Sequence, residues 1–252
     1  MQSSDADKKT CEEISLLDSL NGEWLKLPTK IMSDVGPATQ TFAGVLMIAN
    51  RETYVSVKAI AKRARLPIGT VRKHLVTLHD HGWIENFGRG HTRSGRARRT
   101  CTFKVTSKAK AALCDYGILP WWACRYGRLQ WSGKAVLSVV LARLAAMKRA
   151  VEEQGWDESL GEELFAEFLE TLGGEDRFRF SLENLQRQTG LWSQAIVMGK
   201  RRLKKLGIVD WVRSTRDDGG DDQDIIFPNA AFRVVVTPTT DDLVSLTFKV
   251  VG

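Results

Sequence analysis

The side chains of this sequence that could do chemistry are mostly cations, and they are concentrated in one stretch. Residues 56–104 contain twelve Lys and Arg side chains and two acidic ones, an excess larger than the net charge of +7 on all 252 residues. Five of the arginines lie in the segment GRGHTRSGRARR (88–99). Guanidinium and ammonium groups bind phosphate oxygens, whereas a solvated surface usually mixes charges of both signs. This stretch therefore predicts contact with a polyanion.

The sequence gives no comparable sign of other chemistry. It contains no phosphate-binding loop, zinc-protease motif or serine-hydrolase motif, so we expect no enzymatic activity. His74, His79 and His81 could join Cys101 at a zinc ion. They lie within the basic stretch, however, where histidines more often face phosphates or pack beside neighbouring segments. The acidic segment 216–224 lacks the spacing and the terminal Glu of a calcium loop. We therefore expect no metal and no cofactor.

The elements that must position the cations follow a familiar order. A helix is expected over residues 39–50, after the extended segment EWLKLP (23–28). Ser56 is a favourable N-cap for a second helix and Gly82 a favourable end for a third, with Pro67 between them. Alternating segments on both sides of the arginine-rich turn are expected to be strands. The order helix, helix, turn, helix, strand, wing, strand is that of a winged helix-turn-helix.

The third helix would turn its polar side toward a DNA groove. Its inner face has apolar residues at helical spacing, Val71, Leu75 and Leu78. We expect DNA contacts from its outer face and from the wing, with base reading centred near the start of the helix. The expected DNA-binding residues are Gly69, Thr70, Arg72, Lys73, Thr77, Arg89, His91, Arg93, Arg96, Arg98 and Arg99.

The second half of the chain repeats this pattern. The segment that starts at Ser56 aligns with the segment that starts at Ser181 at a constant offset of 125 residues over 29 positions, with matches mainly in the core and at helix ends. Leu27-Pro28 precedes the first unit, and Leu119-Pro120 precedes the second. An internal repeat of this kind predicts two tandem winged helices.

The two units carry different charges. The third helix of the second unit ends in basic residues, and we expect DNA contacts from Ser193, Gln194, Lys200 and Arg201. Its wing is acidic instead, with five aspartates in 217–224, which phosphates repel. Either this unit meets DNA through its helix alone, or it serves as a protein contact.

The fold class expected from these patterns is mainly helical α+β, with small β-wings on two tandem winged helix-turn-helix domains. The expected boundaries are a flexible lead at 1–22, a DNA-binding domain at 23–116, an aromatic connector at 117–131, and a second domain at 132–252 with an acidic insertion at 155–176. Trp and Tyr side chains of the connector should form a domain or subunit contact, and stacking on unpaired bases is the alternative. The polar N-terminus, the lack of a long apolar stretch and the lack of a CxxC pair predict a cytoplasmic, nucleoid-associated protein.

This layout resembles the replication initiators of bacterial plasmids and phages. Their extended "KLP" segment is matched by EWLKLPTKIM (23–32), which is followed by TFAGVLMIAN (41–50) and the helix-turn-helix at 56–84. The resemblance covers 23–106 by residue pattern and 119–238 by architecture. It implies double-stranded DNA and host replication proteins as partners. The acidic second wing departs from a family in which both units can touch DNA.

The leading hypothesis is thus a sequence-specific double-stranded DNA-binding protein that initiates plasmid or phage DNA replication. One alternative is a transcriptional repressor, a homodimer formed through the second winged helix. Another is a mobile-element adaptor that docks an enzyme through its second domain. Neither the target sequence nor the oligomeric state follows from the residues.

Overall fold

The computed structural model of the protein describes residues 12–17, 20, 24–49, 56–91, 97–112, 116–214, 223–237 and 245–250. More of these residues lie in helices than in strands, and the strands form small antiparallel sheets. The expectation of a mainly helical α+β fold is confirmed at this level. None of the helices in this described part is long and apolar enough to cross a membrane.

A first series of elements begins with a strand and ends with a β-hairpin and a short helix. We call the part from β2 to β4 the first repeat. The order is β2 (Trp24–Pro28), α1 (Thr29–Val35), the 3₁₀ helix η2 (Gly36–Ala38), α2 (Thr39–Ala49), α3 (Val57–Ala64), α4 (Ile68–Asp80), β3 (Ile84–His91), β4 (Ala97–Val105) and α5 (Ser107–Ala111).

A second series follows the same order, with additional elements after its long helix. We call the part from β5 to β8 the second repeat. The order is β5 (Tyr116–Pro120), α6 (Trp121–Arg125), η4 (Gly127–Leu129), α7 (Gln130–Glu152), η5 (Glu158–Leu160), α8 (Gly161–Thr171), η6 (Gly174–Phe178), β6 (Arg179–Ser181), α9 (Leu182–Thr189), α10 (Ser193–Lys205), β7 (Val209–Ser214) and β8 (Gln223–Pro228). The elements from η5 to β6 have no counterpart among the described elements of the first repeat.

The offset of 125 residues holds at the boundaries of matching elements. It relates α3 to α9, α4 to α10 and the start of β3 to the start of β7. The side chains of Ser56 and Ser181 both cap a helix, each accepting a hydrogen bond from the backbone N–H three residues on, at 3.0 and 3.1 Å. Gly82 and Gly207 both follow a helix with φ of 70° and 67°, a conformation that glycine adopts without steric penalty. The two segments therefore share local structure as well as core residues.

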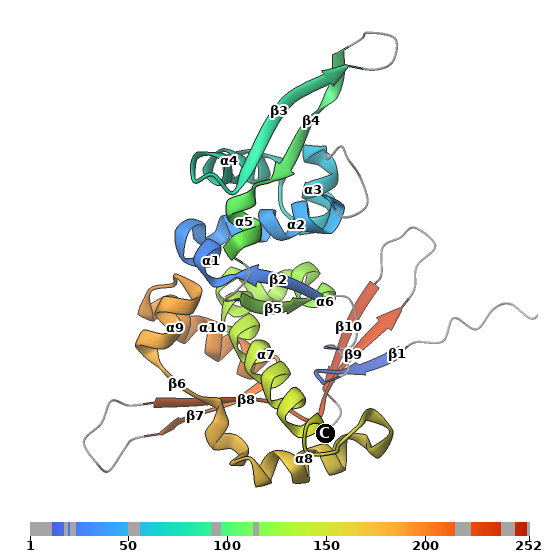
Figure 1. Ribbon diagram of the computed structural model, residues 1–252, viewed down its shortest axis with the longest axis vertical. Helices are drawn as coiled ribbons and strands as arrows, with labels where there is room; N and C mark the ends of the chain where they lie inside the picture. Colours follow the sequence, from blue (N-terminus) through green and yellow to red (C-terminus); the bar gives the residue numbers. More distant parts are fainter. Residues whose placement is uncertain are drawn as a thin grey trace, which may run out of the picture.

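Strands β2 and β5 pair with each other and join the two repeats (Figure 1). The pairing is antiparallel, with Lys26 opposite Ile118 in the middle and Leu27 opposite Gly117. An offset of 92 residues, which matches Leu27 to Leu119, maps every pair of this ribbon onto a pair of the same ribbon, for example Trp24–Pro120 onto Tyr116–Pro28. The register is therefore the one expected if the repeats are related by a two-fold axis through the ribbon.

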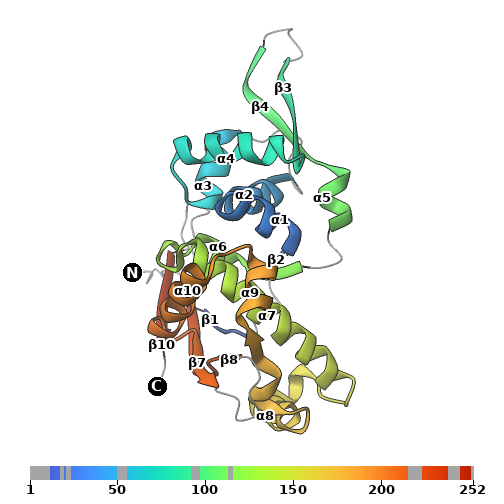
Figure 2. The same ribbon diagram turned by 90° about the vertical axis from the view of Figure 1, so that its left-hand side faces the viewer.

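Helix contacts beside the ribbon follow the same relation. In Figure 2, α3 and α4 lie on one side of the ribbon, and α9 and α10 lie on the other. Helix α9 packs on α1 of the other repeat, and α3 likewise packs on α6. The first of these contacts is tight, because a Cβ at Gly190 would lie 2.2 Å from the Cα of Ser33. A single hydrophobic cluster extends through both repeats, from Phe42 to Leu203.

Two segments at the ends of the chain differ from the sequence expectations. The lead expected to be flexible at 1–22 contains β1 (Glu12–Ser15), which pairs with β9 (Phe232–Thr237). Residues 232–237 lie in the part of the chain expected to form the second winged helix, but they form this β9, in a separate sheet of order β1-β9-β10 with β10 at Ser245–Val250. The alternation of apolar and polar residues in a strand indicates which of its faces is buried, but it does not indicate which other strand pairs with it.

The aromatic connector is part of the folded core. Trp122 in α6 is buried and packs on Phe232 in β9, with the ring centroids 5.7 Å apart. Tyr126 and Trp131 are half-buried. Trp122 thus links the second repeat to the terminal sheet, and its buried ring is not available for stacking on bases.

Candidate nucleic-acid interface

Helix α4 has a buried apolar face and a solvent-exposed basic face. Val71, Leu75 and Leu78 are buried, and the helix packs against α2 and α3. Arg72 and Lys73 are exposed. Since the apolar residues recur at helical spacing, their burial fixes the rotation of the helix and leaves these two cations in solvent.

The other expected residues of α4 lie around the same exposed face. Gly69 is exposed, and Thr70 and Thr77 are half-buried. The Thr77 hydroxyl donates a hydrogen bond to the carbonyl of Lys73 at 3.3 Å. Val76, which the sequence reasoning missed, is 60% exposed. An exposed methyl-bearing side chain on a helix of this kind can contact the methyl group of thymine. The sequence did contain a signal for Val76, namely an apolar residue at a helix position outside the buried face.

Packing of the three helices holds α4 in place. A Cβ at Gly44 in α2 would lie 3.1 Å from the Cβ of Ala64 and 3.3 Å from Cγ2 of Ile60, so glycine permits the close crossing of α2 and α3. The Gln40 side chain donates a hydrogen bond to the carbonyl of Ala64 at 2.8 Å. Arg65 follows with a positive φ of 49° and turns the chain toward α4. The turn between α3 and α4 is thus fixed by contacts from α2.

His74 belongs to this scaffold. Its Nδ1 lies 2.8 Å from the hydroxyl oxygen of Thr41 in α2. Burial lowers the pKa of His74 below its ordinary value, so the imidazole adds no charge at neutral pH. Among the residues that the structure describes, no group of three His, Cys, Asp or Glu side chains could hold a metal ion.

The β3–β4 hairpin extends beyond α4 (Figure 1). The buried ring of Trp83 lies at its base, where the Thr106 hydroxyl donates a hydrogen bond to the carbonyl of Gly82 at 2.8 Å. These contacts attach the hairpin to the end of α4. The backbone places the expected wing residues Arg89 and His91 in β3 and Arg98 and Arg99 in β4, whereas Arg93 and Arg96 lie outside the described residues.

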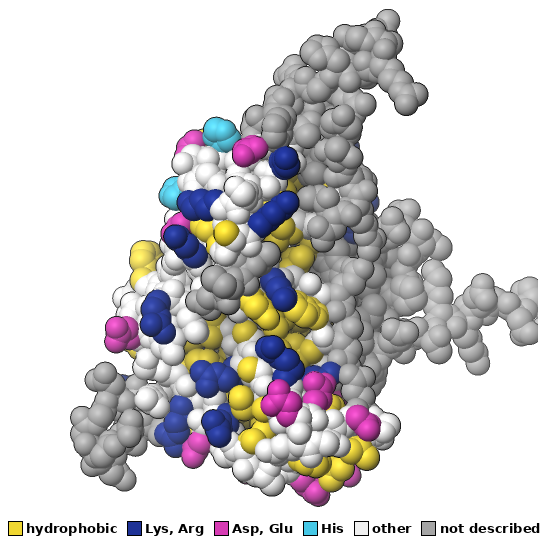
Figure 3. Space-filling model, viewed as in Figure 1, with side chains coloured by type: hydrophobic (Ala, Val, Ile, Leu, Met, Phe, Trp, Pro, Cys, Tyr) yellow, Lys and Arg dark blue, Asp and Glu magenta, His cyan; other side chains and the backbone are white. Residues whose placement is uncertain are grey.

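Further cations surround α4. Lys58, Lys62 and Arg65, on and after α3, are exposed. The acidic residues Asp80 and Glu85 are exposed at the far end of α4 and on β3. In Figure 3 the end of the molecule that holds α4 shows Lys and Arg side chains together with some Asp, Glu and His side chains, and further Asp and Glu side chains gather over α8 at the other end. Among the described residues on and beside α4, the exposed cations therefore outnumber the exposed carboxylates.

Helix α10 occupies the place of α4 in the second repeat but presents a different surface. The expected contacts Ser193, Gln194 and Arg201 are exposed. Large apolar residues are exposed beside them, with Trp192 at 73% and Met198 at 54%. Met198 stands where α4 has a lysine, at the offset of 125 residues. The alignment of the repeats contains this difference, although the sequence reasoning did not use it.

Lys200 does not lie where the sequence led us to expect it. Its side chain is only 2% exposed and forms an ion pair with Asp224 in β8. The Trp211 indole N–H donates to the same carboxylate at 2.7 Å, and the Lys200 ammonium lies 4.5 Å from the centroid of the Trp211 ring. A buried ammonium held in this way cannot reach a DNA phosphate without losing its partner, so Lys200 is removed from the candidate interface. The offset of 125 residues matches Lys200 to the buried Leu75, and it lies between the buried Ile196 and Leu203 at helical spacing, so its side chain turns inward to a carboxylate.

The candidate interface is therefore the exposed face of α4 with the adjoining hairpin. A second surface lies on α10, where Arg201, Lys204 and Lys205 are exposed together with Trp192 and Met198. Comparison of the chain with known proteins finds no matching family model, no matching curated protein and no matching solved structure.

Proposed function

We propose that the protein binds double-stranded DNA sequence-specifically through the first repeat, acting as a winged helix. In this proposal α4 lies in the major groove and the β3–β4 hairpin contacts the flanking backbone or minor groove. The observation that supports it most is the exposure of Arg72 and Lys73 opposite the buried face of α4. Both residues lie in the first half of the helix, from which side chains reach base edges and phosphates.

The second repeat is proposed to be a further winged helix. The shared caps, the common offset and the symmetric β2–β5 ribbon support a duplication. Its exposed Ser193, Gln194 and Arg201 fit a DNA contact through α10. The exposed Trp192 and Met198 instead favour a protein contact, since aromatic and Met side chains are enriched at such interfaces.

The biological role that we propose is initiation of plasmid or phage DNA replication. It rests on the resemblance of the β2 segment and the helix-turn-helix to initiators. A repressor that dimerises through the second repeat is the second candidate, favoured by the exposed apolar residues of α10. Footprinting on DNA selected from a random pool separates the two, because direct repeats of one site support an initiator and a single palindrome supports a repressor.

The DNA-binding proposal is tested by fluorescence anisotropy with the selected site and a scrambled duplex. Arg72→Ala should cost roughly 1–3 kcal/mol on the selected site and less on the scrambled one. The matched control is Arg149→Ala, which removes an exposed arginine on α7 in the second repeat. Equal losses on both duplexes would assign Arg72 to phosphate contacts. A variant that binds both duplexes as the unaltered protein does would refute the proposed interface.

A further inference from the structure

A cavity of about 390 Å³ lies between α8, the turn after β1 and the end of β8. Figure 1 shows α8 at the opposite end of the molecule from α4. Sites that bind small molecules have volumes of about 300–1,000 Å³. Apolar side chains form most of this wall, among them Leu16, Leu144, Phe165, Leu169, Phe178 and Phe227. The cavity depends on α8, so it belongs to the part of the second repeat that the first repeat lacks.

All charged side chains of the cavity wall are carboxylates, from Glu162, Glu170 and Asp210. Asp210 is half-buried on β7, whereas Glu170 is exposed on α8. Among the described residues, neither Glu170 nor Asp210 takes part in an ion pair or a side-chain hydrogen bond. A half-buried carboxylate such as that of Asp210 favours a cation as its partner. The wall therefore combines apolar surface with negative charge that is not compensated.

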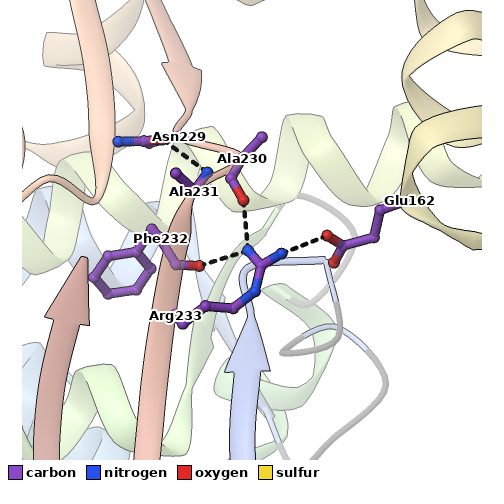
Figure 4. Close-up of polar contacts among 6 residues, drawn as sticks. All are labelled: Glu162, Asn229, Ala230, Ala231, Phe232 and Arg233. Atoms are coloured by element: carbon purple, nitrogen blue, oxygen red, sulfur yellow. Dashed lines mark hydrogen bonds and ion pairs between the residues drawn. The ribbon is translucent and has the colours of Figure 1, made fainter. Parts of the chain in front are cut away.

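Glu162 differs from the other two because Arg233 already pairs with it (Figure 4). The Arg233 guanidinium donates to the Glu162 carboxylate at 2.9 Å and to the carbonyl of Phe232 at 3.1 Å. It also donates to the carbonyl of Ala230. In the same turn, the Asn229 side chain accepts a hydrogen bond from the backbone N–H of Ala231 at 2.9 Å. Arg233 thus joins α8 to the turn between β8 and β9, and the cavity is held open by a preformed frame.

We propose that this cavity binds a small amphiphilic cation, with its apolar body against the Phe and Leu side chains and its protonated amine at Asp210 and Glu170. An anion of the same size would meet the unpaired carboxylates of Asp210 and Glu170 and be repelled. A neutral apolar molecule would fill the space but leave both carboxylates without a partner. The site does not depend on the proposed DNA binding, since none of its residues belongs to the α4 surface.

The test uses three probes that share one apolar body, namely phenethylamine, 2-phenylethanol and phenylacetate. Binding to the full chain is measured at pH 7 by ligand-observed NMR titration. The amine should bind roughly tenfold or more tightly than the alcohol, as expected for a charge-assisted contact, and the acid should bind most weakly. Absence of amine binding, or equal affinities for amine and alcohol, would overturn the proposal.

Variants locate the bound probe. Asp210→Asn and Glu170→Gln should each weaken amine binding and leave alcohol binding unchanged. Ala166→Phe, at an exposed position of α8 that lines the cavity, should abolish binding of both probes by filling the space. Glu163→Gln is the matched control, because Glu163 is an exposed carboxylate of α8 outside the wall. Circular dichroism checks the fold of each variant, and if Asp210→Asn unfolds, Glu170→Gln decides the charge requirement. Amine binding that survives Ala166→Phe would place the probe elsewhere and refute the site.

Discussion

Gly190 of α9 and Ser33 of α1 lie in direct backbone contact across the junction of the two repeats. A Cβ at residue 190 would lie 2.2 Å from the Cα of Ser33 and 2.7 Å from the carbonyl oxygen of Met32. Gly190 also has a φ of 66°, at the C-terminal cap of α9. The matching residue of the first repeat is Arg65, which has a φ of 49° but an exposed side chain. The requirement for glycine at residue 190 therefore comes from the contact between the repeats as well as from the turn.

Replacement of Gly190 tests how strongly the repeats are coupled. Gly82→Ala serves as the control, because Gly82 has a similar φ of 70° but open space around its Cβ, so it measures backbone strain alone. We expect Gly82→Ala to cost about 1–2 kcal/mol of unfolding free energy. Gly190→Ala should cost a further 1–3 kcal/mol or so, because α9 must move away from α1. Urea unfolding measures both, and equal losses would show that the α1–α9 contact contributes little.

The two segments expected to be wings, 88–99 and 216–224, should differ in their effect on DNA binding. With roughly six phosphate contacts, the slope of log K against log salt should be about −5. The triple change of Arg96, Arg98 and Arg99 to Ala should weaken binding to every duplex. It should also make the slope shallower by up to about 0.9 for each phosphate that the variant no longer neutralises. A slope that does not change would show that these arginines do not meet phosphates.

The acidic wing provides the matched comparison. Changing Asp217, Asp218, Asp221 and Asp222 to Asn should leave affinity unchanged if this wing points away from DNA, and should raise it if the wing approaches phosphates. Asp224 is left unaltered because it pairs with Lys200. If these Asn changes abolished binding while the arginine changes had no effect, the second repeat would be the DNA reader.

Asp224→Asn should instead act on stability. It leaves the buried ammonium of Lys200 without a charged partner, which typically costs about 3–5 kcal/mol. The double variant Lys200→Met/Asp224→Asn removes both charges and should regain most of that loss, as measured by chemical unfolding. A single and a double variant of equal stability would mean that the ion pair is not the reason for the loss.

Because the ammonium of Lys134 is buried, we expect the free energy of unfolding to rise at alkaline pH. Its ammonium is buried and donates a hydrogen bond to the carbonyl of Cys124 at 2.8 Å. Burial lowers the pKa of Lys134 from 10.5 to about 8, while the negative charge of a Cys124 thiolate acts to raise this pKa and the positive charge of Arg65 acts to lower it. Between these two pH values the unfolded chain binds more protons than the folded chain, so the free energy of unfolding rises with pH.

The expected rise between pH 8 and pH 10.5 is about 3 kcal/mol, and it is absent below pH 8, where Lys134 is protonated in both states. Lys134→Met should be more stable than the unaltered chain at pH 7, and the difference should shrink across that window. Urea unfolding of both proteins at pH 7, 9 and 10.5 measures the difference. A constant difference at all three values would contradict the role of Lys134.

The amino-acid sequence by itself determined the local elements. Ser56 and Ser181 indicate helix starts, and Gly82 and Gly207 indicate helix ends, because capping and positive φ depend on the identity of one or two residues. The helical spacing of apolar residues likewise predicted which face of α4 is buried. Arg72 and Lys73 were therefore placed in solvent from the sequence, and the structure has them there.

Only the tertiary structure decided which distant residues meet. Lys200 has the residue type of a DNA contact, but its burial depends on Asp224, which lies on another element. The pairing of β1 with β9 joins the two ends of the described chain, and the cavity beside α8 needs side chains from several separate parts of the sequence. Such contacts are decided by the packing of whole elements and by the pairing of buried charges. These free energies depend on partners far away in the chain, whereas propensity and periodicity report only on near neighbours.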